Sequence, residues 1–428
     1  MRYIFGPWST GLALCARLWA VAPAVAAQEP PPDTLTLAAA LVSAANNNPL
    51  IRAAELRVRE ASGNLTQAAV LLAENPEIAA TRGRRTPLTG STAYDIEFEV
   101  GLEQRLEIAG QRGKRMDAAR SGVEAARSDA EDVRRVVSLT VAATYFEALA
   151  ANQRVALAER NERLTADLLG LATRRLDSGI GTPLEVNAAV VRHAEARRST
   201  LEALSRRDAA LVRLQALLGL DGAPPRLAGA LPELALPLDV DAVVSLAQAV
   251  RPDLAGAARR AEAAAARSRL ASAEAWPDVA LAASLAREEG DDVFRAGVRI
   301  PLALFDRRQG ARASARAEAD RAAAEREAVR LEVVADARAA GLAYERAAAA
   351  LRLYDDEVLQ AQRESADLVQ LAAESGEVSI LDVLVVQREL LDGLLGHLEA
   401  RLEVARAQAR VLAAVDRPQT TPLTEIGR

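Results

Sequence analysis

One turn occurs twice in this chain, and each copy interrupts a very long stretch with helical hydrophobic periodicity. The first copy reads SGIGTPLEV at residues 178–186, and the second reads SGEVSILDV at residues 375–383. Matching positions of the two copies lie 197 residues apart. Self-similarity at a fixed separation indicates a duplicated architecture rather than two unrelated domains. The fold must therefore be one that two copies of a single unit can build together.

Further segments repeat at a similar separation. NNNPLIRAAELRVREA at 46–61 pairs with AVRPDLAGAARRAEAA at 249–264, and QRGKR at 111–115 pairs with RQGAR at 308–312. A proline- and glycine-rich segment, typical of a linker, joins the two halves. We predict a first repeat at 28–218, a linker at 219–239, a second repeat at 240–415 and a C-terminal tail at 416–428.

The two repeats are expected to be mainly helical. Half of the residues are hydrophobic but only 3% are aromatic, a mixture that favours long helices over the core of a compact enzyme. Proline is absent from about 113 to 174 and from 310 to 374, so each stretch could form a helix of about 60 residues, or roughly 90 Å. Amphipathic helices of this length bury their apolar stripe only by packing along their whole length.

Four short segments change to an alternation of period two, which predicts strands at 77–83, 94–106, 278–286 and 292–304. The residues of the predicted apolar face are Ile96, Phe98, Val100, Leu102, Val279, Leu281, Phe294, Val298, Ile300 and Leu302. Those of the polar face are Glu97, Glu99, Glu103, Arg295 and Arg299. Each repeat therefore has the order helix, two strands, very long helix, turn, long helix.

The alternation alone fits two structures. The strands could span a bilayer with their apolar face toward lipid, or they could be amphipathic hairpins packed on helices of a soluble protein. The flanking polar loops and the lack of other strands favour the first interpretation. Four strands cannot close a barrel, and open edges in lipid are costly, so several chains must combine. Three chains would supply twelve strands and a usable lumen.

Residues 1–27 have the pattern of a secretory signal peptide, with Arg2, an apolar segment and small residues before a cleavage site after Ala27. Cleavage would remove Cys15, the only cysteine. Lipidation of Cys15 is not expected, because Leu14 stands where a lipoprotein needs a small residue. No later segment reaches the roughly 18 consecutive apolar residues that a membrane-spanning helix requires.

With these motifs the chain resembles the TolC family of trimeric outer-membrane exit ducts, from residue 35 to residue 415. LEQRLEIAGQRGKR at 102–115 and VRIPLALFDRRQGAR at 298–312 are similar to the heavy-metal efflux branch of that family, the cobalt-zinc-cadmium and copper-silver ducts. The resemblance implies a mostly α fold with a small β part, in which a homotrimer forms a long α-helical barrel and a transmembrane β-barrel. It also implies three partners: outer-membrane lipid, a periplasmic adaptor protein and an inner-membrane pump of the RND type.

In that family the two repeated turns are periplasmic tips, where the tunnel narrows and the adaptor docks. The residues so implicated are Ser178, Gly179, Leu184, Glu185, Val186, Ser375, Gly376, Leu381, Asp382, Val383 and Val385. The two glycines suit a chain reversal because glycine reaches positive φ without penalty. Each of the two acids could cap its returning helix or line the pore. Val385 stands where the family often has a second acid, so a doubled acidic gate is not expected.

The sequence offers no catalytic, cofactor-binding or metal-binding site. His193 and His397 are the only histidines, and they do not cluster with other residues that could ligate a metal. No motif for a nucleophile or a phosphate-binding loop is present, and the net charge of −6 gives no basic patch for nucleic acid. The leading hypothesis is a passive efflux duct for heavy-metal cations. The alternatives are organic toxicants or secreted polypeptides as cargo, and, more distantly, a periplasmic coiled-coil scaffold.

Overall fold

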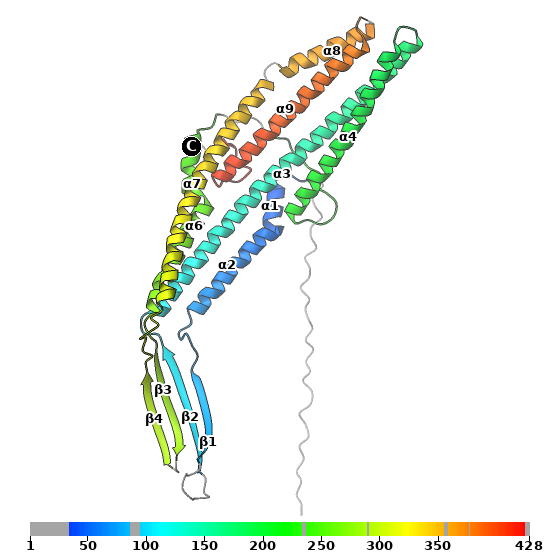
Figure 1. Ribbon diagram of the computed structural model, residues 1–428. Helices are drawn as coiled ribbons and strands as arrows, with labels where there is room; N and C mark the ends of the chain where they lie inside the picture. Colours follow the sequence, from blue (N-terminus) through cyan, green and yellow to red (C-terminus); the bar gives the residue numbers. More distant parts are fainter. Residues whose placement is uncertain are drawn as a thin grey trace, which may run out of the picture.

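The protein is a long body of helices with one small sheet at its end (Figure 1). The computed structural model describes residues 34–85, 95–232, 237–288, 291–354, 358–375 and 377–423. In chain order the elements are α1 Leu37–Asn47, α2 Pro49–Ala68, β1 Glu77–Arg85, β2 Asp95–Leu106, α3 Gln111–Asp177, α4 Pro183–Leu218, α5 Val240–Val250, α6 Pro252–Ala273, β3 Val279–Glu288, β4 Asp291–Arg299, α7 Gln309–Leu353, α8 Leu359–Ser375 and α9 Ile380–Ala414. The mostly helical class with a small β part is confirmed.

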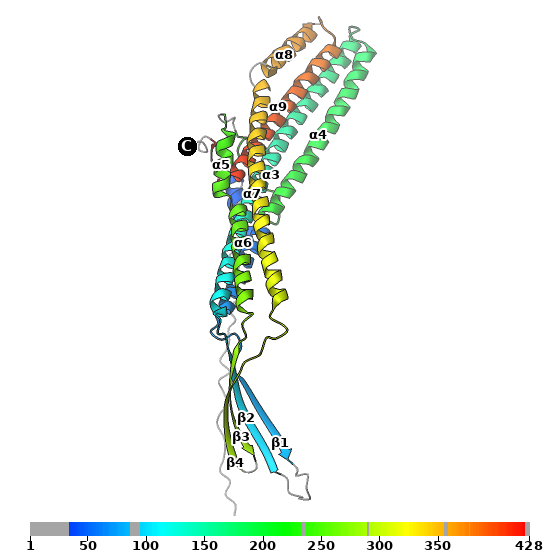
Figure 2. The same cartoon turned by 60° about the vertical axis from the view of Figure 1, so that its left-hand side comes forward.

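Helix α3 is the longest element and the one around which the other helices pack. It has 67 residues, or roughly 100 Å at 1.5 Å per residue. Toward the sheet it packs against α2 and α6, and toward the opposite end against α4 and α9 (Figures 1 and 2). Many buried positions along these contacts are alanines, including the fully buried Ala142, Ala148, Ala172, Ala189 and Ala405. Small side chains let the helix axes approach closely along their length.

The predicted uninterrupted helix at 310–374 is wrong. Helix α7 ends at Leu353 and α8 begins at Leu359. At this point the ring of Tyr354 lies against α9, with its centroid 6.3 Å from that of His397. A Cβ atom on Gly396 would be 2.5 Å from the Tyr354 hydroxyl oxygen. The division between α7 and α8 thus coincides with the place where the large side chain of Tyr354 packs on the backbone of Gly396. The absence of proline from 310–374 could not have indicated this division.

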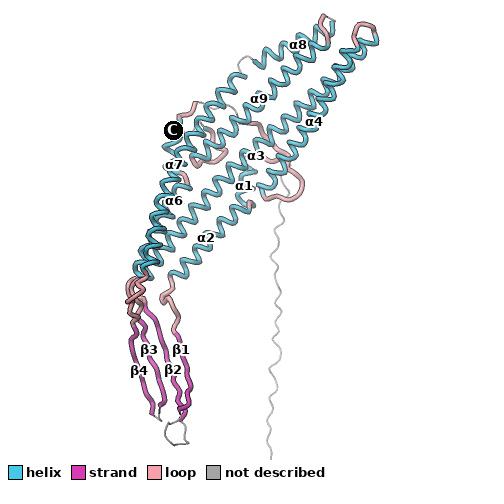
Figure 3. The backbone as a smooth tube through the Cα atoms, viewed as in Figure 1, coloured by secondary structure: helices cyan, strands magenta, loops and turns pink. Residues whose placement is uncertain are grey.

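The four strands form one antiparallel sheet in the order β1-β2-β3-β4, which extends away from the helices (Figure 3). The register sets Val100 opposite Leu285, and Leu285 opposite Phe294. Residues directly opposite one another share a face, so the apolar side chains of all four strands gather on one side. Most of them are exposed, because none of the described helices covers that face.

Two of the predicted strand residues lie beyond the sheet. Ile300 and Leu302 follow the last residue of β4, Arg299, because Pro301 has no N–H to continue a ladder. Val279 is the first residue of β3 and is half-buried. The remaining residues of the predicted apolar face lie within their strands as expected.

The chain turns from strand to helix in the same way in both halves. The side-chain oxygen of Gln111 accepts a hydrogen bond from the N–H of Ala109 at 2.7 Å, and that of Gln309 accepts one from the N–H of Arg307 at 2.8 Å. The residue before each glutamine is left-handed, Gly110 at φ 71° and Arg308 at φ 52°. The repeated motifs QRGKR and RQGAR therefore encode one corner geometry.

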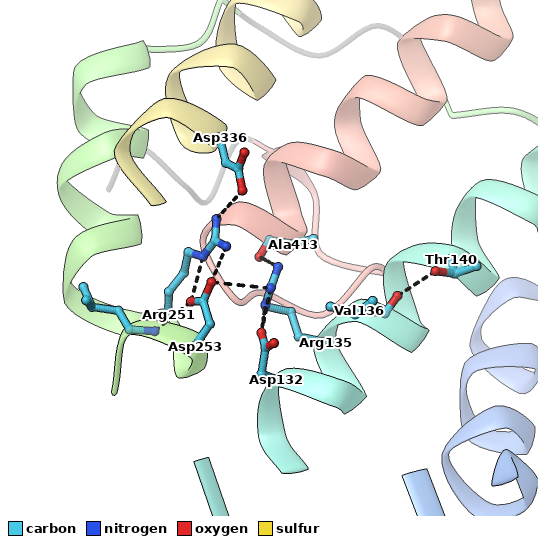
Figure 4. Close-up of polar contacts among 9 residues, drawn as sticks. Asp132, Arg135, Val136, Thr140, Arg251, Asp253, Asp336 and Ala413 are labelled. Atoms are coloured by element: carbon cyan, nitrogen blue, oxygen red, sulfur yellow. Dashed lines mark hydrogen bonds and ion pairs between the residues drawn. The ribbon is translucent and has the colours of Figure 1, made fainter. Parts of the chain in front are cut away.

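A group of charged side chains around the buried Arg251 joins the two halves (Figure 4). The guanidinium of Arg251, whose side chain is 5% exposed, donates to both carboxylate oxygens of Asp253 at 3.0 and 2.5 Å. A further nitrogen of Arg251 lies 3.5 Å from Asp336 of α7. From α3, Arg135 pairs with Asp132 at 2.6 Å and donates to the carbonyl oxygen of Ala413, at the end of α9. One network thus connects α3, α6, α7 and α9.

The position of Arg251 has a neutral counterpart in the first half. Asn48, which also precedes a proline at a helix junction, donates to the carbonyl oxygen of Leu217 at 2.8 Å and caps α2 by accepting from the N–H of Leu50 at 2.9 Å. The side chain of Asn48 therefore joins the end of α4 to the α1–α2 junction. At the corresponding place in the second half, charged side chains make the connection.

Substitution of Arg251 by methionine should lower the free energy of unfolding by about 2 kcal/mol, because Asp253 would lose two charge-assisted hydrogen bonds and keep only the more distant charge of Arg135. Urea titration in detergent, followed by circular dichroism at a helical wavelength, measures this loss. The double variant R251M/D253L should recover much of the lost stability, since it removes both charges. Equal instability of the single and double variants would contradict this account.

The stability contributed by this network should fall at acid pH. Burial alone would raise the pKa of Asp253, but the hydrogen bonds and charge of Arg251, together with the charge of Arg135, hold that pKa below its usual range. An acid with a lowered folded pKa stabilises the fold above the pKa of the unfolded carboxyl, about 4, and loses this effect as the pH drops through the folded value. The stability of the wild type should therefore fall relative to that of R251M/D253L as the pH drops below about 4.

Replacement of Gly110 by alanine should destabilise the protein by about 1 kcal/mol, because an L side chain is unfavourable at positive φ. Gly122 offers a matched control, since it lies within α3 and a Cβ atom there would meet nothing within 4 Å. Alanine at that position should raise the stability by about 0.5–1 kcal/mol. The same unfolding titration compares the two, and effects of the same sign would contradict the corner geometry.

Candidate functional site

The two helical hairpins end close together at the end of the body farthest from the sheet (Figure 1). One hairpin consists of α3 and α4, and the other of α8 and α9. The two sequence-predicted turns lie at these ends. We refer to residues 178–182 as the first tip and to residues 375–379 as the second tip.

The first tip is a glycine turn closed by backbone hydrogen bonds. Gly179 has φ 78°, and the N–H groups of Ile180 and Gly181 both donate to the carbonyl oxygen of Arg175, at 3.0 and 2.8 Å. A Cβ atom on Gly181 would lie 2.8 Å from the backbone nitrogen of Leu176. Gly181 is therefore needed for this close approach of the backbone. The second copy of the motif has Val378 at the matching position, so the repeat gave no indication that Gly181 is required.

Both returning helices begin with the same reciprocal cap. At α4 the Thr182 hydroxyl accepts from the N–H of Glu185 at 3.3 Å, and the Glu185 carboxylate accepts from the N–H of Thr182 at 2.8 Å. At α9 the Ser379 hydroxyl accepts from the N–H of Asp382 at 3.3 Å, and the Asp382 carboxylate accepts from the N–H of Ser379 at 3.1 Å. This arrangement is a capping box, which satisfies two otherwise unpaired donors at a helix start.

The two acids differ in their exposure. Glu185 is only 6% exposed, so its carboxylate is committed to the cap. Asp382 makes the same hydrogen bonds but remains exposed. Of the two alternatives left open by the sequence, both acids therefore cap, and Asp382 alone also presents charge to solvent.

A small apolar core holds the two hairpins together behind the tips. It is formed by Leu168 and Ala172 of α3, Ala189 of α4, and Ile380, Val383 and Leu384 of α9. Val186 is half-buried and packs against this core, and Leu381 is half-buried as well. Val383, one of the predicted tip residues, is thus buried in this core rather than exposed at the surface of the tip.

Other apolar side chains at the tips face outward. Leu184 is 66% exposed, and Ile180 and Val385 are also exposed. Ser178 is exposed too, and its hydroxyl donates to the carbonyl oxygen of Arg175 at 3.0 Å. Ser375 is the last residue of α8, and Gly376 lies outside the described residues.

At the opposite end of the body, the polar face of the sheet is hollow and charged. Glu103 of β2 pairs with Arg299 of β4 at 2.6 Å, and Arg295 pairs with Glu288 at 2.7 Å. Strand β3 lies between β2 and β4 and presents only small residues to this face before Glu288, namely Ala280, Ala282, Ser284 and Ala286. Long side chains therefore meet across β3, over a hollow of about 400 Å³ that Glu99 also lines. Glu97 lies on the same face, half-buried.

The histidines contribute to contacts between helices. A ring nitrogen of His193 on α4 lies 3.3 Å from the hydroxyl of Thr165 on α3. Within the described ranges there is no group of three or more His, Cys, Asp or Glu residues that could hold a metal ion. None of the helices in the same ranges is long and apolar enough to cross a membrane.

Removal of the Thr182 hydroxyl by substitution with alanine should weaken the start of α4 by about 1 kcal/mol, since the first helical N–H groups lose their acceptor. Hydrogen exchange of the backbone amides at 184–187, read by mass spectrometry, should accelerate about fivefold, the factor that corresponds to 1 kcal/mol. Ser379→Ala should produce the same change at 380–384 and leave 184–187 unaffected. Acceleration at both tips in each variant would contradict two independent caps.

A model of one protein family, described as Outer membrane efflux protein, matches residues 40–220 and 243–416. The chain is 30% identical to the cobalt-zinc-cadmium resistance protein CzcC of Cupriavidus metallidurans over 93% of this chain and 96% of that protein. It is 27% identical to the pyoverdine export outer membrane protein OpmQ of Pseudomonas putida, over 86% of this chain and 82% of that protein.

The fold is also similar to solved structures. The transmembrane channel protein CusC superimposes with a TM-score of 0.74 at 20% identity, over 89% of this chain and 91% of that one. The resemblance noted from the repeated turns and corners is thus confirmed by the family model, which covers both halves. The chain is an outer-membrane protein and belongs to the outer membrane efflux protein family.

Proposed function

We propose that three copies of this chain form the exit duct of a tripartite efflux system, and that its cargo is heavy-metal cations. The assignment of the cargo rests on one observation. The chain is 30% identical, over nearly the full length of both chains, to a protein named for cobalt, zinc and cadmium resistance. The duct would be passive, with energy supplied by an inner-membrane pump of the RND type. We assign no catalytic step to the chain.

The open edges of the sheet support assembly. Strands β1 and β4 each have one neighbour in the chain, and an unpaired strand edge in lipid leaves costly polar groups. Pairing of β4 with β1 of the next copy would give twelve strands, with the apolar face toward lipid and the face of Glu103, Arg295 and Arg299 toward the lumen. The first repeat at 28–218, the linker at 219–239 and the second repeat at 240–415 would then together make up each protomer.

The tips are the proposed site of adaptor docking and of the narrowest part of the tunnel. Exposed Ile180, Leu184 and Val385 offer apolar contacts of the kind on which a partner helix packs. In a trimer Asp382 would recur three times around one axis, and its exposed carboxylate supports an acidic ring. Glu185 is too buried in its cap to take part.

Organic molecules are the second candidate cargo. The observation that favours them is the similarity to OpmQ, named for the export of pyoverdine. This relative is less similar and covers less of the chain than the metal-resistance protein, so we rank organic cargo below metals.

Deletion of the gene should make the bacterium sensitive to zinc, cadmium or cobalt while its tolerance of dyes and antibiotics stays unchanged. Minimal inhibitory concentrations measured across graded metals and organic compounds test this, with the gene supplied on a plasmid as the control. Sensitivity to organic compounds alone would contradict metal cargo and leave the duct intact. A protein recovered as a detergent-free periplasmic monomer would contradict the duct itself.

Asp382→Asn should reduce the preference for cations over anions when single channels are recorded in a planar bilayer, because three exposed charges would leave the proposed ring. The side-chain oxygen of asparagine can still accept from the N–H of Ser379, so the turn should be kept. Glu185→Gln is the matched control, since glutamine preserves the capping box and the buried carboxylate should not affect permeation. Equal effects of the two substitutions would argue against a ring at Asp382.

A further inference from the structure

The connection from β4 to α7 exposes a run of apolar side chains that nothing in the described chain covers. Residues 300–305 read IPLALF, and we call them the apolar corner. Leu302 is 77% exposed, Leu304 is 64% exposed and Phe305 is 93% exposed. Contiguous apolar surface of this kind marks a place where a protein meets a partner or a membrane.

The two halves differ in where the strand before the corner ends. Strand β2 continues to Leu106, four residues before the last residue ahead of α3, whereas β4 ends at Arg299 and residues 300–308 lead into α7. Both halves then make the same turn, with a left-handed residue followed by a glutamine that accepts from the N–H two residues before it. Residues 300–304 therefore hold the place of the last residues of β2, but they lie outside the sheet because Pro301 has no N–H to continue the ladder.

We infer that the apolar corner lies in the periplasmic interface of the outer membrane, with Phe305 at the boundary of the acyl chains. This inference rests on the proposed placement of the sheet in the membrane. Strand β4 has nine residues, or about 30 Å at 3.4 Å per residue, which when tilted matches the roughly 25 Å apolar band of such barrels. The residues just beyond its helical end then fall at the edge of the bilayer.

The apolar face of the sheet continues toward this level. Val298 near the end of β4 and Ile108 just beyond β2 are both exposed large apolar residues, and they lie at the end of the sheet that adjoins the helices (Figure 2). Aromatic side chains are enriched where such barrels leave the hydrocarbon. Phe305 thus has the residue type and the position of an interfacial anchor.

The charge beside Phe305 fits phospholipid headgroups. Arg307 is exposed, and no acidic side chain among the described residues pairs with it. Its neighbour Arg308 is engaged with Glu274 at 2.7 Å. A guanidinium next to an interfacial aromatic can bind lipid phosphate in the manner of juxtamembrane basic residues.

A second copy of the chain is the rival occupant, because β4 is an open edge. Leu302 borders a hollow of about 480 Å³ together with Trp276, Glu103 and Arg299, so this residue turns toward the polar side of the sheet. Phe305 does not border that hollow. The surroundings of the Phe305 side chain therefore distinguish contact of the apolar corner with lipid from contact with a second copy of the chain.

Single-tryptophan variants test the inference. Trp276 is the only tryptophan outside residues 1–27, so F305W/W276F carries one fluorophore at the apolar corner. F294W/W276F marks the apolar face of β4, and L201W/W276F marks an equally exposed leucine on α4. Each protein, checked as an intact oligomer by gel mobility, is placed in phosphatidylethanolamine and phosphatidylglycerol vesicles with or without bromine high on the acyl chains.

We expect F305W/W276F to lose about half of its emission in brominated vesicles, because an interfacial ring lies within contact of the upper acyl chain. F294W/W276F should also be quenched and L201W/W276F should not. Quenching at position 294 without quenching at 305 would overturn the inference and leave the membrane placement standing. Loss of quenching at both positions would overturn the placement as well. L304W/W276F serves in the same way if the first variant does not assemble.

Discussion

The apolar face of a helix of roughly 100 Å must be covered along its whole length, and this constraint shapes the whole protein. Helix stability in proteins comes mainly from tertiary packing of an amphipathic face, so α3 must be covered along its full length. The chain meets this demand in two stages, with α2 and α6 near the sheet and α4 and α9 toward the tips. Alanine at many contact positions keeps the neighbouring axes close. The hairpin tips and the sheet are held at opposite ends by this packed body.

The duplication explains why the two ends are built from paired elements. Each half contributes one strand pair and one helical hairpin, and corresponding residues have the same local role. Gln111 and Gln309 stabilise the corners, and Thr182 and Ser379 cap the returning helices. The halves diverge where long-range contacts differ. The first half has a short corner and a neutral junction at Asn48, and the second has an apolar corner and a charged junction.

Local signals in the sequence predicted much of this structure. The alternation of Ile96, Phe98, Val100 and Leu102 placed these residues on one face because strand periodicity is a property of the backbone. Glu185 and Asp382 indicate the starts of the returning helices, because the helix dipole favours an acid in the first turn. The capping boxes with Thr182 and Ser379 are added by the structure. Membership of the family followed from the same repeated motifs. Two features of the structure could not be predicted, because they depend on contacts between residues far apart in the sequence. The division between α7 and α8 involves Tyr354 and Gly396. The network of Arg251 needs four helices in place before its partners can be recognised.

The difference between Asn48 and Arg251 has a consequence for how the chain folds. Two similar halves within one polypeptide could exchange helices during folding, and the two junctions make different contacts with the rest of the chain. Asn48 needs only a carbonyl oxygen, which Leu217 supplies, whereas Arg251 is buried and needs the carboxylates of Asp253 and Asp336. An exchanged arrangement would separate the guanidinium from Asp336 of α7. The unlike junctions therefore favour the native pairing over an exchanged one, because the exchange would leave a buried guanidinium without one of its carboxylates.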